Sequence, residues 1–327
     1  MRLSVYLVLG MGVFAVGWAA IFIRLADAPA LSTAAYRLTF AAIPVATYAT
    51  FRHRTDLRGL RRGNRWLLVA SGAALAVHFA TWIGSLQLTS VASSVALVTT
   101  QPLWAALIAA AFLGERVTRG TAVAMLVATA GGVLIGVRDF AAGGEALVGD
   151  ALALVGALCA AIYFTIGRRL RVGLDLPAYI GVVYPAAAVL LLAMTLVARQ
   201  PLSGFSGETW LMFLLLALVP QLIGHSSLNW AVRYLPAHVV TVALLGEPVL
   251  STVLAIPILG ERPGLLRIVG GAVTLAGVYL VLRESKPNPP APVPRRAGGG
   301  AGHPSCPTIV GRARRGTGTR GRMRHPR

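Results

Sequence analysis

Long apolar runs follow one another along most of the chain, separated by short polar or basic loops. Each run has about 20 residues, the length at which a helix crosses a ~30 Å hydrocarbon core. The runs are continuous, whereas the strands of a membrane barrel alternate apolar and polar residues. The pattern therefore predicts an all-α polytopic membrane protein with ten transmembrane helices. The predicted spans are 4–23, 32–51, 66–87, 90–113, 120–137, 150–167, 178–197, 209–229, 238–259 and 264–282.

The two halves of the apolar region resemble each other. The sequence Leu-Gly-Glu-Arg occurs at 113–116 and again at 259–262, which is 146 residues later. Between 102–134 and 248–280, 11 of 33 aligned positions are identical. With five spans in each copy, the second copy has to cross the membrane in the opposite sense to the first. Such a 5+5 inverted repeat is typical of transporters, whose site lies between the repeats near the middle of the membrane.

The duplication divides the chain into four parts. We predict a first five-helix unit at 1–137, an inter-repeat loop at 138–149, a second five-helix unit at 150–282 and a tail at 283–327. The tail is rich in Pro, Gly and Arg, so we expect it to be disordered. Its basic charge fits anionic lipid headgroups. The alternative is a solvated extension without a specific partner, and no nucleic-acid partner is expected.

Composition and charge agree with a membrane protein and give its orientation. The chain is 56% hydrophobic and 13% charged, with a net charge of +19. The loop at 52–65 contains six Arg and one Asp. Because short Arg-rich loops stay in the cytoplasm, both termini are predicted to be cytoplasmic. Residues 1–30 also resemble a signal peptide, but a retained first span fits the paired units better.

Polar groups inside the apolar spans are candidates for function, because burying them in hydrocarbon is costly. Glu247 lies well inside the ninth span, beside Pro248, and could take up and release a proton. Its counterpart in the first unit is Gln101, which also precedes a proline. Two polar side chains beside two helix breaks predict a solute site near the middle of the membrane. The alternative for Glu247 is a structural carboxyl that fixes helix packing.

Two polar stripes strengthen this prediction. The eighth span carries Gln221, His225 and Asn229 at a spacing of four, which places them on one face of an α-helix. In the third span, His78 and Trp82 form a similar stripe. We predict that both stripes line a cavity and bind solute, with His225 as a second candidate for proton coupling. Histidines that only serve packing are the alternative.

Arg37 lies near the outer end of the second span. Snorkelling of its charge toward the interface is the plain interpretation. Pairing with Glu247 or binding of a substrate anion is the alternative. No metal is predicted, since no carboxylate accompanies either cavity histidine at ligand spacing. No cofactor and no enzymatic activity are expected either, because the chain lacks a Walker-type phosphate loop and the common hydrolase motifs.

Several segments together resemble a known family. They are Ala-Ala-Tyr-Arg at 34–37, the stretches 95–116 and 244–262, and the Gly-rich fifth and tenth spans. They are similar to the EamA type of the drug/metabolite transporter (DMT) superfamily, over residues 1–282. One departure is Gly17-Trp18, where relatives usually have Trp-Gly. The resemblance implies ten helices in a 5+5 repeat and a plasma-membrane carrier, commonly an exporter, for small metabolites, amino acids or drugs.

The function expected from the sequence is secondary transport of a small-molecule solute by alternating access, in the direction of export, with proton coupling left open. The expected location is the bacterial inner membrane, as a multi-pass protein in contact with the lipid bilayer. The alternative is an intramembrane lipid-modifying enzyme or a lipid flippase. The solute, the coupling ion and the oligomeric state, including a homodimer, stay open at this point.

Overall fold

The computed structural model describes residues 2–53, 62–89, 94, 97–115, 117–136, 144–260 and 264–284. Within these ranges the chain is helical and contains no strand, as predicted for an all-α protein. Several features of the sequence prediction fall elsewhere. Arg116, the Glu261-Arg262 part of the second motif, much of the inter-repeat loop and residues 285–327 of the tail lie outside the described residues.

In the described part of the chain a helix occupies, wholly or in part, each segment that was predicted to cross the membrane. The helices are α1 (Arg2–Gly17), α2 (Ala19–Leu25), α3 (Ala30–Arg52), α5 (Arg62–Leu88), α7 (Gln101–Leu113), α8 (Arg119–Gly136), α9 (Glu145–Arg171), α10 (Leu176–Val197), α11 (Gly207–Leu216), the π-helix η2 (Ala217–His225), α12 (Ser226–Ala231), α13 (Ala237–Ala243), α14 (Gly246–Leu259) and α15 (Leu265–Glu284).

Six helical stretches among the described residues are long and apolar enough to cross a membrane, by length and composition. They are Leu3–Leu25, Arg62–Leu88, Glu145–Arg171, Leu176–Val197, Gly207–Ala231 and Ala237–Leu259. Two shorter apolar helical stretches are Gln101–Leu113 and Arg119–Leu134. The chain is therefore a multi-pass helical membrane protein.

The Leu-Gly pair that begins the repeated motif ends a helix in each copy. Gly114 after α7 has φ 65° and Gly260 after α14 has φ 67°. This left-handed conformation favours glycine, which has no Cβ to collide with the following carbonyl. The N–H of Gly114 donates to the carbonyl of Ala109, and the N–H of Gly260 donates to the carbonyl of Ala255. The motif is thus a helix-stop signal that acts in the same way twice.

Two helices begin inside predicted spans. α7 begins at Gln101 and α14 at Gly246, each directly after a turn in the apolar segment. Pro102 and Pro248 fall in the first turn of these helices, where a missing N–H costs no helical hydrogen bond. Both predicted spans are therefore discontinuous, and the polar residue that precedes each proline lies at the break.

Two further interruptions occur in the first and eighth spans. α1 and α2 are separated at Trp18, and the carbonyl of the preceding Gly17 accepts a hydrogen bond of 2.8 Å from Ser251 Oγ of α14. The π-helix η2 contains Pro220, which cannot donate a backbone hydrogen bond. π-helical turns are rare and concentrate at functional sites.

Three pairs of helices pack along much of their length: α5 with α9, α3 with α10, and α8 with α15. In the last pair, glycines allow the closest approach. A Cβ atom on Gly131 would collide with the backbone of Thr274, and one on Gly277 would collide with the backbone of Ala128. Residues 131 and 277 are 146 apart, as are residues 128 and 274. The contact between α8 and α15 is therefore reciprocal between the two halves.

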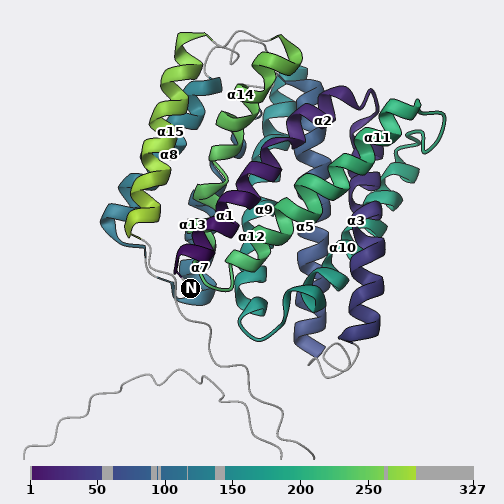
Figure 1. Ribbon diagram of the computed structural model, residues 1–327, viewed down its shortest axis with the longest axis horizontal. Coiled ribbons are helices and arrows are strands. Elements are labelled where there is room, and N and C mark those ends of the chain that lie inside the picture. The colour runs from purple at the N-terminus through teal and green to yellow at the C-terminus, as the bar shows by residue number, and fades with distance from the viewer. Residues whose placement is uncertain are drawn as a thin grey trace, which may run out of the picture. The chain divides into compact units, whose positions relative to one another are not determined.

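α1 begins and α15 ends at the same end of the helical bundle, which we call the terminal end (Figure 1). There the Tyr6 hydroxyl donates to the carbonyl of Leu282 at 3.3 Å. Thr121 Oγ1, near the start of α8, donates to Glu284 Oε2 at 2.9 Å. α7 ends just before α8 and thus stops at the terminal end. α14 stops where α15 begins, about 30 Å away along a helix of 20 residues.

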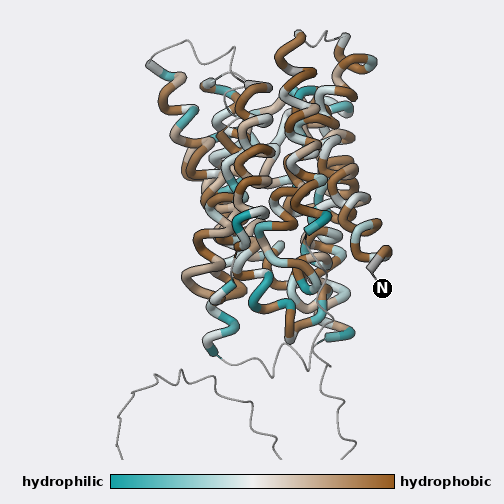
Figure 2. Tube along the Cα trace, turned by 90° about the vertical axis from the view of Figure 1, so that its left-hand side faces the viewer, coloured by the Kyte–Doolittle hydropathy of each residue, from teal (hydrophilic) through white to brown (hydrophobic). Residues whose placement is uncertain are grey.

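Hydrophobic residues occur along most of the height of the helices (Figure 2), and many of the large ones are exposed. Leu107, Phe112 and Val197 are 64%, 75% and 85% exposed. The interior, in contrast, contains polar side chains with no exposed surface, among them Gln221 and Asn229. Large apolar patches are rare on soluble monomers, whereas a protein that faces lipid needs them. The described helices therefore have the polarity of a membrane-embedded bundle.

Candidate functional site

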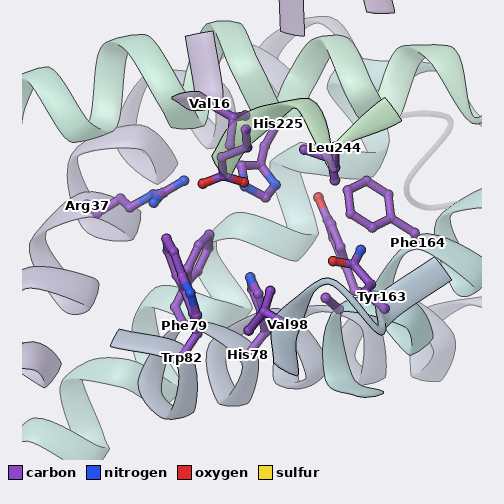
Figure 3. A pocket seen from close by; sticks show the side chains of 13 residues that line it. Val16, Arg37, His78, Phe79, Trp82, Val98, Tyr163, Phe164, His225 and Leu244 are labelled. Atoms are coloured by element: carbon purple, nitrogen blue, oxygen red, sulfur yellow. The ribbon is translucent and has the colours of Figure 1, made fainter. Parts of the chain in front are cut away.

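A cavity lies inside the bundle between helices of the two predicted units (Figure 3). Arg37 projects into it from one side, and Tyr163 and Phe164 of α9 lie at the opposite side. Its empty volume is about 420 Å³, counting the part that is open to solvent. The lining residues are Val16, Arg37, His78, Phe79, Trp82, Val98, Gln101, Ala160, Tyr163, Phe164, His225, Leu244 and Glu247.

Arg37 of α3 is fully buried, so the interpretation as a snorkelling side chain is wrong. Its Nε donates to Gln221 Oε1 at 2.9 Å, and its guanidinium carbon lies 4.1 Å from the centre of the Phe79 ring. Both terminal nitrogens, Nη1 and Nη2, lack a hydrogen-bond partner. Arg37 interacts electrostatically with Glu247. The structure thus places a guanidinium group at the cavity, with two terminal nitrogens that are free to donate hydrogen bonds.

Gln101 and Glu247 both line the cavity, at the helix breaks where the sequence placed them. Gln101 is the first residue of α7 and is 6% exposed, and its Nε2 has no hydrogen-bond partner. Glu247 lies in the first turn of α14 and is half-buried. The N-terminus of a helix favours a nearby negative charge, which helps to keep a carboxylate in this apolar interior.

His78 and His225 also line the cavity. His78 Nδ1 lies 2.9 Å from the carbonyl oxygen of Gly156, and its ring is stacked on Trp82 at 5.9 Å between centroids. His225 has an unpartnered Nδ1 and is stacked on Phe164 at 6.3 Å. Both histidines therefore pack against an aromatic ring and also line the cavity. Among the described residues no group of three or more His, Cys, Asp or Glu could hold a metal ion.

Gln221 and Asn229 lie behind the cavity and do not line it. Of the three residues in this predicted stripe, only His225 lines the cavity. Gln221 Oε1 accepts from Arg37, as described above. Asn229 Nδ2 donates to the hydroxyl of Tyr163 and, at 2.7 Å, to the carbonyl of His225. Both amides therefore hold lining residues in place.

The sequence reasoning missed the aromatic walls of the cavity. Phe79, Tyr163 and Phe164 line the cavity but lie in apolar runs of the sequence. In such a run, an aromatic residue is usually interpreted as part of the packed core. Phe79 directly follows His78, which was predicted to line the cavity, so its position next to His78 could have indicated that it lies near the cavity. Tyr163 offered another, since a tyrosine hydroxyl buried in an apolar run needs a hydrogen-bond partner.

A cluster of ion pairs and hydrogen bonds lies at the terminal end. Arg168 Nε of α9 lies 3.0 Å from Glu115 Oε1, just after α7. Arg168 Nη1 donates to the carbonyls of Val232 and Arg233 at 3.0 and 2.9 Å, just after α12. Arg233 pairs in turn with Asp175 at 3.1 Å, just before α10. This terminal-end cluster joins helices of both halves.

The fold and the cavity define a class of protein: a multi-pass helical membrane protein with a cavity, lined by aromatic and polar groups, between helices of its first and second halves. The chain belongs to the EamA-like transporter family, whose model matches residues 2–137 and again 147–283. This is the family that the resemblance indicated. It places the chain among transporters and not among enzymes.

Two curated relatives carry the name of a transporter. A probable terminal-alkyne amino-acid exporter of Streptantibioticus cattleyicolor is 31% identical over 199 residues, which is 58% of this chain and 63% of the relative. The match therefore spans less than two thirds of that exporter. An uncharacterized transporter of Archaeoglobus fulgidus is 26% identical over 206 residues, 62% of this chain and 71% of the relative.

A crystal structure described only as that of a protein has the same fold. The TM-score is 0.70 at 19% identity, over 86% of this chain and 96% of the other. At this identity the likeness concerns the fold alone.

Proposed function

We propose that this protein is a secondary transporter that exports small organic solutes by alternating access. The observation that carries the proposal is the cavity, because it is enclosed between the two halves and combines aromatic walls with unpartnered polar groups. Arg37, Trp82 and Gln101 reach it from the first half, and His225 and Glu247 reach it from the second. Discontinuous helices with polar residues at their breaks are typical of substrate sites in secondary transporters.

The proposed mechanism requires ten spans arranged as a 5+5 inverted repeat, with units at 1–137 and 150–282 joined by the loop at 138–149. This arrangement is supported by the two equivalent helix stops, which lie at opposite ends of the bundle, and by the reciprocal α8–α15 contact. It is also supported by the double match of the family model. A repeat of this kind can open its central site to either side in turn.

The proposed location is the bacterial inner membrane with both termini in the cytoplasm, which makes the terminal end the cytoplasmic end. Support comes from the adjacency of Tyr6 and Leu282 and from the Arg-rich loop at 52–65. The terminal-end cluster then closes the cytoplasmic side in the conformation described. Export would require this cluster to separate so that solute can enter from the cytoplasm.

The proposed solute class follows from the cavity and from one relative. The name of the relative from Streptantibioticus cattleyicolor is that of an amino-acid exporter, and this cavity offers a cationic, an anionic and several aromatic groups. We therefore propose small amphipathic metabolites, amino acids included, as solutes. Glu247 and His225 are the proposed proton-coupling residues, since both are titratable and both line the cavity.

The test is counterflow in proteoliposomes. Purified protein is reconstituted, loaded with unlabelled amino acids and small organic acids, and diluted into trace labelled solute, with and without a pH gradient. A carrier accumulates label transiently in the absence of any other energy source. If no solute shows counterflow while labelled phospholipid crosses the bilayer faster than in empty liposomes, the flippase alternative replaces the proposal. If neither moves, transport by this chain is rejected.

A further inference from the structure

We propose that Arg37 is the anion subsite of this cavity and binds the carboxylate of a monoanionic or zwitterionic solute. The inference rests on the proposed transport function and adds the chemical group that the site recognises. It starts from hydrogen bonds that are not made: a guanidinium with no exposed surface lies in the interior of the bundle, and two of its nitrogens have no hydrogen-bond partner. Unsatisfied buried donors are costly, especially on a charged group.

The orientation of the Arg37 side chain is fixed on the side that faces away from solute. Gln221 accepts from Nε at 2.9 Å, and the Phe79 ring lies against the guanidinium plane at 4.1 Å. These contacts restrict rotation of the guanidinium and leave Nη1 and Nη2 as the open pair. A planar guanidinium with two free N–H edges matches the geometry of a carboxylate, to which it donates two parallel hydrogen bonds.

Neighbouring groups suit the same ligand. Trp82 Nε1 and Gln101 Nε2 are buried at the cavity and have no hydrogen-bond partner. Both are donors, so an acceptor-rich group satisfies them and Arg37 together. The aromatic walls formed by Phe164 and Tyr163 suit an apolar remainder of the solute.

Glu247 limits the charge of the ligand. Its carboxyl group lines the same cavity as Arg37 and interacts with it electrostatically, so it offsets part of the cationic charge when it is ionised. A solute carboxylate competes with Glu247 for the guanidinium. A dianion such as a phosphate ester would face the charge of Glu247, and Arg37 is the one Lys or Arg among the lining residues. The site therefore favours one carboxylate per solute.

The experiment measures binding of matched acid and amide pairs to the purified full-length protein in detergent, by thermal shift and calorimetry. The probes are 3-phenylpropionate, 4-methylpentanoate, L-phenylalanine and L-leucine, each with its primary amide. We expect at least one acid to bind and its amide to bind about 10- to 100-fold more weakly, the range for charged hydrogen bonds. Equal binding of acid and amide, or no binding by any acid, overturns the proposal.

Variants assign the effect to Arg37. Arg37→Lys keeps the positive charge but removes the planar guanidinium with its two parallel N–H groups. We therefore expect the affinity for acids to fall about tenfold or more. Arg171→Lys is the matched control, because Arg171 is also buried, at 1% exposure, but does not line the cavity and donates to the backbone carbonyls of Asn229 and Leu174. Acid binding that Arg37→Lys leaves unchanged, or that the control reduces equally, contradicts the assignment.

A second variant does not depend on how well Arg37→Lys folds. Glu247→Gln removes the competing carboxylate, and we expect 3-phenylpropionate to bind about three- to tenfold more tightly. Unchanged or weaker binding overturns the proposal. Failure of the subsite is also separable from failure of the proposed function. Counterflow of solutes without a carboxylate, together with equal binding of acids and amides, rejects the subsite and leaves transport standing.

Discussion

At the residue scale, the cavity owes its character to a few polar side chains that apolar spans can retain only at a cost. Arg37, Gln101 and Glu247 come from different helices and meet in one place, and each leaves a polar group facing the cavity. Gln221 and Asn229 contribute indirectly, because they hold Arg37 and Tyr163 in position. Recognition of solute therefore depends both on lining residues and on the amides behind them.

The proposed coupling role of Glu247 gives the first prediction. In Glu247→Gln, a proton gradient should no longer drive uphill transport, because no carboxyl remains to load and release the proton. Counterflow without a gradient should persist. The measurement is solute accumulation in proteoliposomes with an imposed pH gradient, compared with wild type at equal reconstitution. Gradient-driven accumulation at the wild-type level in the variant would remove Glu247 from the coupling mechanism.

The sequence predicted the polar members of the site because an isolated polar residue in an apolar run stands out. It gave the wrong environment for Arg37, since distance from the end of a span does not determine whether a side chain points outward or inward. It also could not identify Phe164 as a wall of the cavity, because an aromatic residue in an apolar span has the same appearance whether it faces lipid, protein or solute.

At the element scale, interruptions of helices determine where the polar groups lie. The breaks before α7 and α14 bring Gln101 and Glu247 to helix N-termini inside the bundle. Their prolines made these breaks predictable. The π-helix η2 was not predictable from the spacing of its polar residues, because a four-residue spacing assumes the α-helical period. The C-cap role of Gly114 and Gly260 can be inferred from the sequence, because a glycine after an apolar helix commonly ends that helix.

The terminal-end cluster gives the second prediction. Ala160 lines the cavity and can carry a probe cysteine in a background with Cys159→Ser and Cys306→Ser. Replacing Arg168 by Gln should weaken the closed end and raise the rate at which a membrane-impermeant maleimide, applied from the terminal-end side, labels position 160. The reason is that Arg168 joins Glu115 to the carbonyls after α12.

Arg169→Gln is the control for this experiment, since Arg169 is the exposed neighbour of Arg168 on the same helix. It removes the same charge without removing the cluster. Labelling rates that rise equally in both variants would indicate a general electrostatic effect on the reagent. A rate in Arg168→Gln equal to that of the parent protein would show that the cluster does not hold this end closed.

The α8–α15 contact gives the third prediction. A Cβ atom at Gly277 collides with backbone atoms of Ala128, which cannot move as a flexible side chain can. Gly277→Ala should therefore destabilise the protein by about 1–3 kcal/mol despite the higher helix propensity of alanine. Thermal unfolding in detergent measures the effect. In Gly271→Ala the new Cβ meets only Val249, at 3.6 Å or more, so this control should be neutral or stabilising.

At the scale of the whole molecule, the proposed arrangement is two copies of one helical unit that face each other across a cavity. Hydrophobic run length predicted the helices, and the repeated motif predicted the pairing of the halves. The sequence could not show which helices pack, since α8 and α15 are far apart in the chain and meet through glycines. The reciprocal contact is what two related halves produce when a twofold axis relates them.

The most direct test concerns the orientation of the two copies. Val117→Cys and Gly264→Cys place single thiols just beyond the two helix stops, in the background without native cysteines. Each is labelled in spheroplasts and in inverted vesicles with a membrane-impermeant maleimide. We predict that position 117 reacts only from the cytoplasmic side and position 264 only from the outer side. Reaction of both positions from the same side would contradict the inverted repeat, and with it the central cavity as a site of alternating access.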